Sequence, residues 1–184
     1  MMSLYLFFMT KNCMVVVLGD VGVGKSTCII RYTQKYFVKE YDPTFENRFK
    51  KHVVLDNDVF LLNILDTAGD VEYFIKENYI RNAEGIIFFF SITCRRSFDM
   101  ISEKYNEVVA FKGTTTFPKV LVGNKCDLER ERIISPEEGE ELANILNCSY
   151  FETSAKEDVN INEVFHHLVT YFKNNETINR NIKL

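Results

Sequence analysis

The residues from Gly19 to Ser26 have the types and the spacing of a phosphate-binding loop. They follow the apolar run Cys13 to Leu18 and satisfy the pattern G-x-x-x-x-G-K-[ST] directly after a predicted strand. Glycines let successive backbone N–H groups approach phosphate oxygens, and the N-terminus of the following helix adds a favourable dipole. Lys25 offers a point charge to the terminal phosphates, and the Ser26 hydroxyl suits Mg²⁺. We therefore predict a phosphate site here; the alternative is a glycine-rich turn that binds nothing.

A second motif indicates which base is bound. Asn124, Lys125, Cys126 and Asp127 follow a strand-like run, at the carboxyl end where ligands bind in parallel sheets. A carboxylate at Asp127 accepts two hydrogen bonds from guanine, whereas adenine leaves it unpaired, which supports discrimination of about 10⁴. The run Glu152 to Lys156 follows the next strand and offers a backbone N–H to the guanine oxygen. The pattern favours guanine and disfavours an ATP-dependent kinase or ATPase.

A third group of residues predicts a metal site. Asp66, which begins the sequence Asp-Thr-Ala-Gly, ends a strand-like run and is placed to hold Mg²⁺ through a water molecule. The N–H of Gly69 is placed to bond a γ-phosphate oxygen. Between the first loop and this strand, Thr44 offers a hydroxyl and a carbonyl that complete the metal site when a third phosphate is bound. The predicted metal ligands are Ser26, Thr44 and Asp66.

These motifs need a scaffold of alternating strands and helices. We predict a helix from Lys25 to about Gln34 and a second one from Pro136 to about Leu146, which starts with the N-cap Ser135 and a capping box. A third helix has one apolar face, made by Ile161, Val164, Phe165, Leu168, Val169 and Phe172. Five of the six predicted strands are Cys13 to Leu18, Phe49 to Leu55, Val59 to Leu65, Gly85 to Thr93 and Lys119 to Gly123, and the sixth precedes Glu152. The second and third of these form a hairpin. The fold class is α/β, with six mostly parallel strands, one antiparallel edge strand and about five helices on both faces.

Length and composition indicate one globular domain. The chain has 184 residues, of which 46% are hydrophobic, and a formal net charge of −4, which disfavours a nucleic-acid-binding surface. We predict an N-terminal extension at 1–9, the domain at 10–173 and a polar tail at 174–184. Five cysteines without a C-x-x-C pair indicate reduced thiols rather than disulfides or zinc. The three histidines lack a metal-binding pattern.

The order and spacing of the motifs between Thr10 and Phe172 resemble those of the Ras superfamily of small GTPases, and within it the Ras, Rap and Rheb-like subfamily. The resemblance implies the G domain of P-loop NTPases and a GTP/GDP switch that hydrolyses GTP with Mg²⁺. It implies catalytic roles for Lys25, Thr44, Gly69 and Asp70. It also implies nucleotide contacts at Val21, Gly22, Val23, Gly24, Lys25, Ser26, Thr27, Phe37, Val38, Tyr41, Pro43, Thr44, Gly69, Asn124, Lys125, Asp127, Leu128, Ser154, Ala155 and Lys156. Phe37 is expected to pack on the guanine ring and Tyr41 to close over the phosphates.

The resemblance also implies partners. Effector proteins are expected to bind through residues 41–49 and 66–80, and exchange factors and GTPase-activating proteins are expected to act on a monomer. The chain ends in Asn-Ile-Lys-Leu, without a cysteine to prenylate, so membrane association is left open. We expect a cytoplasmic location or a peripheral one at the inner face of a membrane. The short connection from Asp127 to Ser135 leaves no room for the helical insertion of Rho proteins.

Two residues depart from the family pattern. Asp70 stands where the family has a glutamine that orients the attacking water, and Val21 stands where a glycine is common. An ionised aspartate places negative charge beside the γ-phosphate, and a β-branched side chain in the loop crowds an incoming arginine. We therefore predict slow hydrolysis. The alternatives are an ordinary switch with unusual residues, and a GTP-binding interaction scaffold with negligible hydrolysis.

Overall fold

The computed structural model describes residues 10–37, 46–67 and 73–181. Its described part holds a six-stranded sheet with the strand order β2-β3-β1-β4-β5-β6. The strands are β1 (Lys11–Gly19), β2 (Glu46–Leu55), β3 (Asp58–Thr67), β4 (Gly85–Ser91), β5 (Lys119–Asn124) and β6 (Ser149–Thr153). The helices are α1 (Lys25–Gln34), α2 (Tyr73–Asn82), α3 (Arg95–Lys112), α4 (Pro136–Leu146) and α5 (Ile161–Asn181), with a short 3₁₀ turn η1 (Glu129–Glu131).

All strand pairs are parallel except β2 with β3, which form an antiparallel hairpin at one edge of the sheet. The hairpin turns at Asp56 and Asn57, and Leu55 pairs with Asp58. Asp56 has φ 52°, a left-handed conformation that aspartate tolerates in tight turns. The predicted α/β class with one antiparallel edge strand is confirmed.

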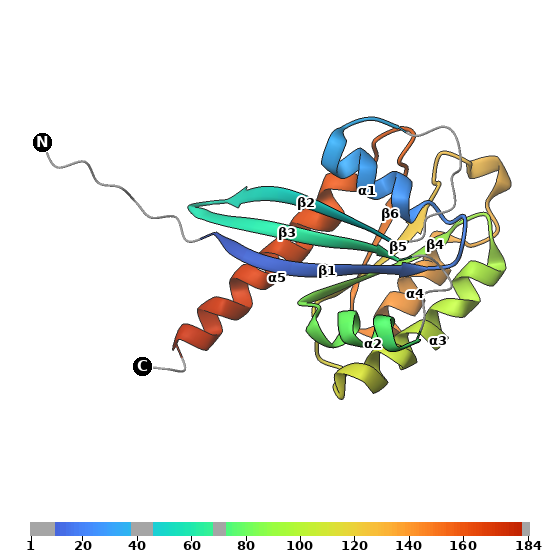
Figure 1. Cartoon of the computed structure of the whole chain (residues 1–184). Coiled ribbons are helices and arrows are strands. Elements are labelled where there is room, and N and C mark those ends of the chain that lie inside the picture. The colour runs from blue at the N-terminus through green and yellow to red at the C-terminus, as the bar shows by residue number, and fades with distance from the viewer. Residues whose placement is uncertain (1–9, 38–45, 68–72, 182–184) are drawn as a thin grey trace, which may run out of the picture.

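Helices cover both faces of the sheet (Figure 1). On one face α1 and α5 belong to the same core cluster as Val15 and Val17, and on the other α2, α3 and α4 belong to the same core cluster as Val16 and Leu18. The alternation along β1 arises because successive side chains of a strand point to opposite faces. β4 is buried throughout, as expected for a central parallel strand covered on both sides.

The boundaries differ from the predictions in informative places. Both hairpin strands are longer than predicted, because cross-strand pairing continues from Phe49 back to Glu46, which pairs with Thr67. β4 ends at Ser91, earlier than predicted, because the Cys94 N–H bonds the carbonyl of Ser91 and turns the chain there. The helix α5 continues to Asn181, into the segment predicted as a polar tail.

The helix α4 begins as predicted. The amide of Glu138 donates to Ser135 Oγ at 3.2 Å, and the amide of Ser135 donates to the Glu138 carboxylate at 2.9 Å, which completes the capping box. In the part of the chain that the structure describes, no helix is both long enough and apolar enough to cross a bilayer.

Candidate functional site

The loop between β1 and α1 owes its shape to two glycines. Gly22 has φ 74° and Gly24 has φ 96°, conformations that L side chains rarely adopt. At Gly24 a Cβ atom would lie 2.4 Å from Nδ2 of Asn124, so a side chain there would also displace the Asn124 amide. Gly24 caps α1, and the helix N-terminus therefore opens directly onto the loop, where its dipole favours an anion.

Lys25 is the first residue of α1, and its side chain reaches back to the start of this loop. Its side chain is buried, and Nζ donates to the carbonyls of Gly19 at 3.0 Å and Asp20 at 2.8 Å. Burial lowers the pKa of Lys25 to about 8, although the nearby Asp66 carboxylate opposes this shift. A phosphate group next to Nζ would favour the charged ammonium again. The two hydrogen bonds thus fix the Lys25 side chain in a position from which it can bind an anion.

Asp66 lies at the end of β3 and is fully buried. Neither of its carboxylate oxygens has a hydrogen-bond partner that meets geometric criteria within the described residues. Burial raises the pKa of Asp66, while the neighbouring Ser26 hydroxyl and Lys25 ammonium oppose that shift. A buried carboxylate without a partner is costly for the protein alone, and a hard cation is the group that relieves the cost. Asp66 and Ser26 therefore fit Mg²⁺.

Asn124, at the end of β5, forms hydrogen bonds to both the phosphate loop and the end of β6. Its Nδ2 donates to the carbonyl of Val23 at 2.8 Å, and its Oδ1 accepts from Thr153 Oγ1 at 3.0 Å and from Cys28 Sγ at 3.4 Å. The sequence predicts a nucleotide contact at Asn124, but in this structure its side chain bonds to the phosphate loop, α1 and β6. The contacts of Thr153 and Cys28 with Asn124 were not predicted, because nothing in their sequence neighbourhood indicates that they meet this residue.

Asp127 follows β5 and has a fixed orientation. Its Oδ1 accepts from Ser154 Oγ at 2.6 Å, and the Ser154 oxygen in turn accepts from the amide of Glu157 at 3.0 Å. Lys156 Nζ lies 3.8 Å from Oδ2 of Asp127, and its exposed side chain makes this a weak ion pair. The hydroxyl of Ser154 thus orients the carboxylate that the sequence assigns to guanine.

Arg31 joins α1 to the loop after β6. Its Nε donates to the carbonyl of Ala155 at 2.8 Å and its Nη2 to the carbonyl of Lys156 at 3.1 Å. The guanidinium also lies over the ring of Phe37, 5.9 Å from its centroid. Sequence analysis missed Arg31, although an arginine two turns into the helix that follows a phosphate loop is well placed for such a link.

The structure thus brings together the phosphate loop, the end of β3 and the loops after β5 and β6 at the carboxyl ends of the parallel strands. Val21 lies on the surface of the phosphate loop and is 54% exposed. Leu128 bonds its amide to the Lys125 carbonyl and so closes the turn behind Asp127. The predicted site residues Val38, Tyr41, Pro43, Thr44, Gly69 and Asp70 lie outside the described residues.

Comparison with known proteins settles the family. A model of the Ras family matches residues 14–174. The chain belongs to the Ras family. It is therefore a GTP-binding small GTPase with a Ras-type G domain, and the resemblance seen in the motifs is confirmed.

Similar proteins from three fungi agree with this assignment. The chain is 43% identical over 160 residues to Ras-like protein 2 of Mucor circinelloides f. lusitanicus, covering 86% of this chain and 81% of that protein. It is 47% identical over 156 residues to Ras-like protein 1 of Saccharomyces cerevisiae, covering 84% and 50% of the two chains. It is 45% identical over 155 residues to a Ras-like protein of Laccaria bicolor, covering 84% and 74%.

Proposed function

We propose that this Ras-family GTPase is a Mg²⁺-dependent GTP/GDP switch that hydrolyses GTP slowly. The observation that supports the slow rate is the exposed, β-branched side chain of Val21 on the surface of the phosphate loop. In this proposal the side chain crowds the space in which a water-orienting residue and an activating arginine would act on the γ-phosphate. Such an arginine contributes about 10³ to 10⁵ in rate in this class of enzyme.

Each end of the nucleotide has its own set of residues in this proposal. Lys25 and the loop amides from Val21 to Thr27 bind the phosphates, and Asp127 binds the guanine edge. Lys125, Leu128, Ala155 and Lys156 complete the walls of the base site. We assign Phe37 and Val38 to contacts with the base, and Tyr41 and Pro43 to contacts with the phosphates.

The metal ligands are Ser26, Thr44 and Asp66. The orphaned carboxylate of Asp66 beside Ser26 supports this assignment. When bound, Mg²⁺ neutralises charge on the β- and γ-phosphates. Asp66 would hold the ion at the end of β3, where the next residue, Thr67, donates its hydroxyl to the Val17 carbonyl at 2.7 Å and fixes the strand end.

Asp70 is the second reason to expect slow turnover. An aspartate is shorter than the glutamine common in the family and, when ionised, cannot donate a hydrogen bond. Its charge also opposes the negative γ-phosphate. In this proposal Gly69 bonds the γ-phosphate through its N–H, and Lys25 and Thr44 act on the same group.

Single-turnover hydrolysis of bound GTP tests this proposal. We compare the wild type with Val21→Gly, Asp70→Gln and the double variant, and expect the double variant to be at least tenfold faster. Equal rates for the wild type and the double variant would refute slow hydrolysis by these residues. Hydrolysis too slow to measure in every variant, with GTP retained on the purified protein, would instead support the interaction scaffold. Asn144→Ala, on the exposed surface of α4, is the control.

Effectors are proposed to bind through residues 41–49 and 66–80. Within the described parts of these segments, Arg48 of β2 donates to the Tyr79 hydroxyl of α2 at 2.6 Å, and its guanidinium lies 5.1 Å from the Tyr79 ring centroid. This contact joins β2 to α2 within the described parts of the two segments. We further propose a monomer with a cytoplasmic location, or a peripheral one at the inner face of a membrane, that is regulated by exchange factors and GTPase-activating proteins.

A further inference from the structure

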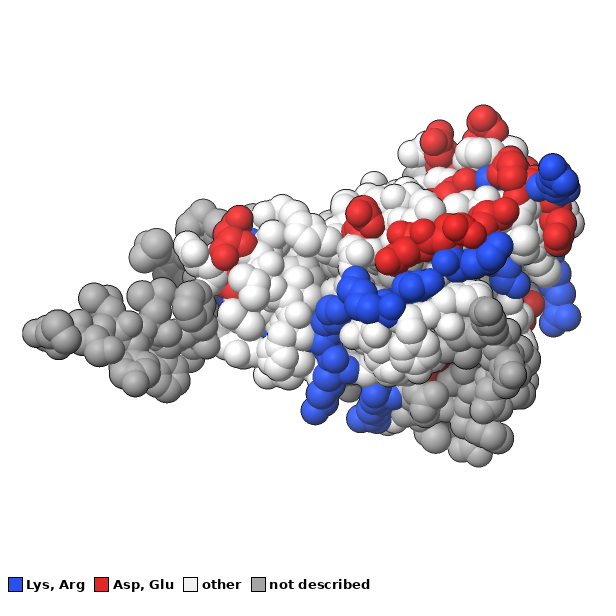
Figure 2. Space-filling model, turned by 90° about the horizontal axis from the view of Figure 1, so that it is seen from above, with Lys and Arg blue, Asp and Glu red and all other residues white. Residues whose placement is uncertain are grey.

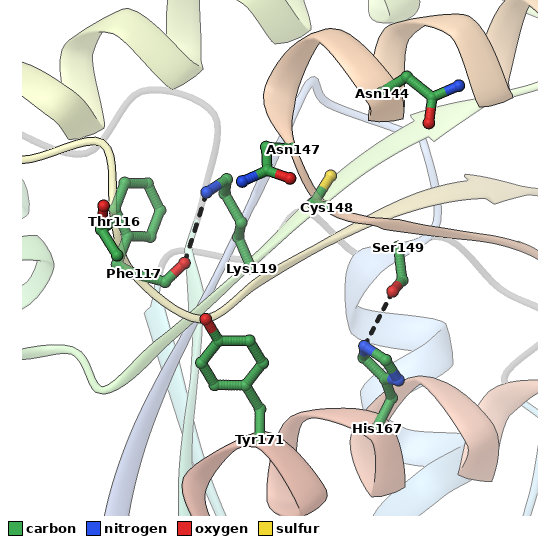
Figure 3. A pocket seen from close by; sticks show the side chains of 9 residues that line it. All are labelled: Thr116, Phe117, Lys119, Asn144, Asn147, Cys148, Ser149, His167 and Tyr171. Carbon is green, nitrogen blue, oxygen red and sulfur yellow. Dashed lines mark hydrogen bonds between the residues drawn. The ribbon is translucent and has the colours of Figure 1, made fainter. Parts of the chain in front are cut away.

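A cavity of about 360 Å³ lies at the end of β5 opposite to the nucleotide site. Lys119 begins β5 and lines the cavity, whereas Asn124 ends the same strand at the nucleotide site. The walls come from the loop before β5, the end of α4, the start of β6 and one face of α5 (Figure 3). Cavities of this size accommodate small organic molecules. Nothing in the Ras-type reaction proposed above uses these residues.

The feature of this cavity that points to a ligand is a buried cation. Lys119 is only 7% exposed, and its Nζ donates to the carbonyls of Thr115 at 3.0 Å and Phe117 at 3.5 Å. Within the described residues no carboxylate forms an ion pair with it, and the lining residues given by the structure include no aspartate or glutamate. The Phe117 ring lies 4.6 Å from Nζ and compensates the charge only in part. A buried ammonium with this environment favours an anion next to it.

Neutral polar groups surround the lysine. Figure 3 shows Lys119 reaching toward Asn147, with the Tyr171 hydroxyl pointing into the same space from α5. His167 and Ser149 form a hydrogen bond of 2.9 Å on the adjoining wall. These groups offer donors to an oxygen ligand, but they add no second fixed charge. Burial also lowers the pKa of His167, which favours its neutral form.

We propose that this cavity binds a small organic monocarboxylate, with the Lys119 ammonium as its counter-charge and the side chains of Asn147 and Tyr171 as hydrogen-bond partners. One buried ammonium matches one carboxylate. A phosphate dianion would need further cations or a cluster of backbone N–H groups, as the phosphate loop provides. The half-exposed ring of Tyr171 at the mouth gives the body of the ligand an apolar contact.

The test uses the full chain loaded with GDP and Mg²⁺. We titrate it with benzoate and with benzyl alcohol, a neutral probe of similar size, and follow backbone amides by ¹⁵N-resolved NMR. We expect saturable shifts at Cys148, Ser149 and Tyr171 with benzoate, and at least tenfold weaker binding of benzyl alcohol. Absence of shifts at these residues, or equal affinity for the two probes, would overturn the proposal.

Comparing variants of two similar lysines, Lys119 and Lys112, tests which ammonium group binds the carboxylate. Lys112 also donates to a backbone carbonyl, that of Ala83 at 2.7 Å, and also lies near the Phe117 ring, but it does not line the cavity. Lys119→Met should weaken benzoate binding at least tenfold, and Lys112→Met should leave it unchanged. Equal effects of the two variants would refute the role of Lys119.

A second variant protects the test against misfolding. Tyr171 is 40% exposed on α5, so Tyr171→Glu leaves the core intact. It places a carboxylate at the mouth of the cavity, where it repels benzoate and competes for Lys119. We expect benzoate binding to be lost while the melting temperature changes little. Wild-type affinity in this variant would contradict the site, whatever the behaviour of Lys119→Met. All these readouts are independent of GTP hydrolysis.

Discussion

The two halves of the nucleotide site are built on opposite principles. At the phosphate end, buried charges lack full compensation: the Asp66 carboxylate has no hydrogen-bond partner among the described residues, and the Lys25 ammonium is partly neutralised by burial. At the base end, the polar groups that matter are already paired, with Asp127 bonded to Ser154 and Asn124 to Thr153.

This difference reflects what each half must recognise. The phosphates and Mg²⁺ are highly charged, so the protein gains most where its own buried charges are incompletely compensated until these ligands bind. Guanine is neutral and is distinguished by the positions of its donors and acceptors. Specificity there requires side chains that are fixed before the base binds. Charged side chains on the surface form a different pattern. On the face shown in Figure 2, one stripe of acidic side chains lies directly beside one stripe of basic side chains.

The largest effect is expected at the base end. Asp127→Ala removes the only carboxylate that the proposed guanine site offers, and Ser154 then loses its acceptor. We expect the preference for GDP over ADP to fall by about 10³ to 10⁴, since a missing hydrogen-bonding group removes most of the discrimination. Competition between labelled guanine and adenine nucleotides measures it. Glu157→Ala on the same exposed loop is the control, and a retained preference in Asp127→Ala would contradict the proposed role.

The link between the two ends gives the next effect. Asn124→Ala leaves the Val23 carbonyl and the Thr153 hydroxyl without their partner. Each buried group left unpaired costs about 1 to 3 kcal/mol, so we expect GDP to be released about 10² times faster. The melting temperature should fall as well. Exposed Asn144→Ala controls for the loss of an amide. If Asn124→Ala weakened only base selection and left the phosphate contacts intact, the two ends would not be linked through this residue.

Substitution of Asp66 should change stability in the opposite direction to Asn124→Ala. In Mg²⁺-free protein, Asp66→Asn removes a buried charge without a partner, so we expect the variant to be more stable by about 1 to 3 kcal/mol. With Mg²⁺ the wild type should gain stability and the variant should not.

The pH dependence follows from the raised pKa of Asp66. A carboxyl group whose folded-state pKa exceeds its unfolded value makes the Mg²⁺-free protein gain stability as pH falls from neutral toward the unfolded pKa. Asp66→Asn should lack this gain from the group. Chemical denaturation at several pH values, with EDTA or with Mg²⁺, measures both effects. A variant that is less stable than the wild type in EDTA would show that Asp66 is satisfied without a metal.

Local sequence patterns predicted most of the fold. The capping box at Ser135 and the apolar run of β4 involve residues close together in the sequence. Interactions between such neighbours determine these elements, so the sequence predicts them. The residues that sequence analysis missed act over long separations. Cys28 meets Asn124 only because α1 and β5 are adjacent in space, and Arg31 reaches Ala155 across the chain. No periodicity encodes such contacts. The end of α5 was also missed, because a polar sequence after Phe172 has the composition of a tail even where it continues a helix.

The smallest expected effect is the uptake of a fraction of a proton when GDP binds. This uptake distinguishes the phosphate end of the nucleotide site from the base end. Because burial lowers the pKa of Lys25 to about 8 and bound phosphates favour its charged form, GDP binding at pH 8 should take up about half a proton. Affinity should then fall as pH rises from about 8. Calorimetry in two buffers of different ionisation enthalpy, with EDTA present, measures the uptake. Lys25→Arg should abolish it, since arginine stays charged, whereas Ser154→Ala at the base end should retain it. Equal uptake by the wild type and Lys25→Arg would place the proton elsewhere, and the phosphate end would then not depend on a lysine neutralised by burial.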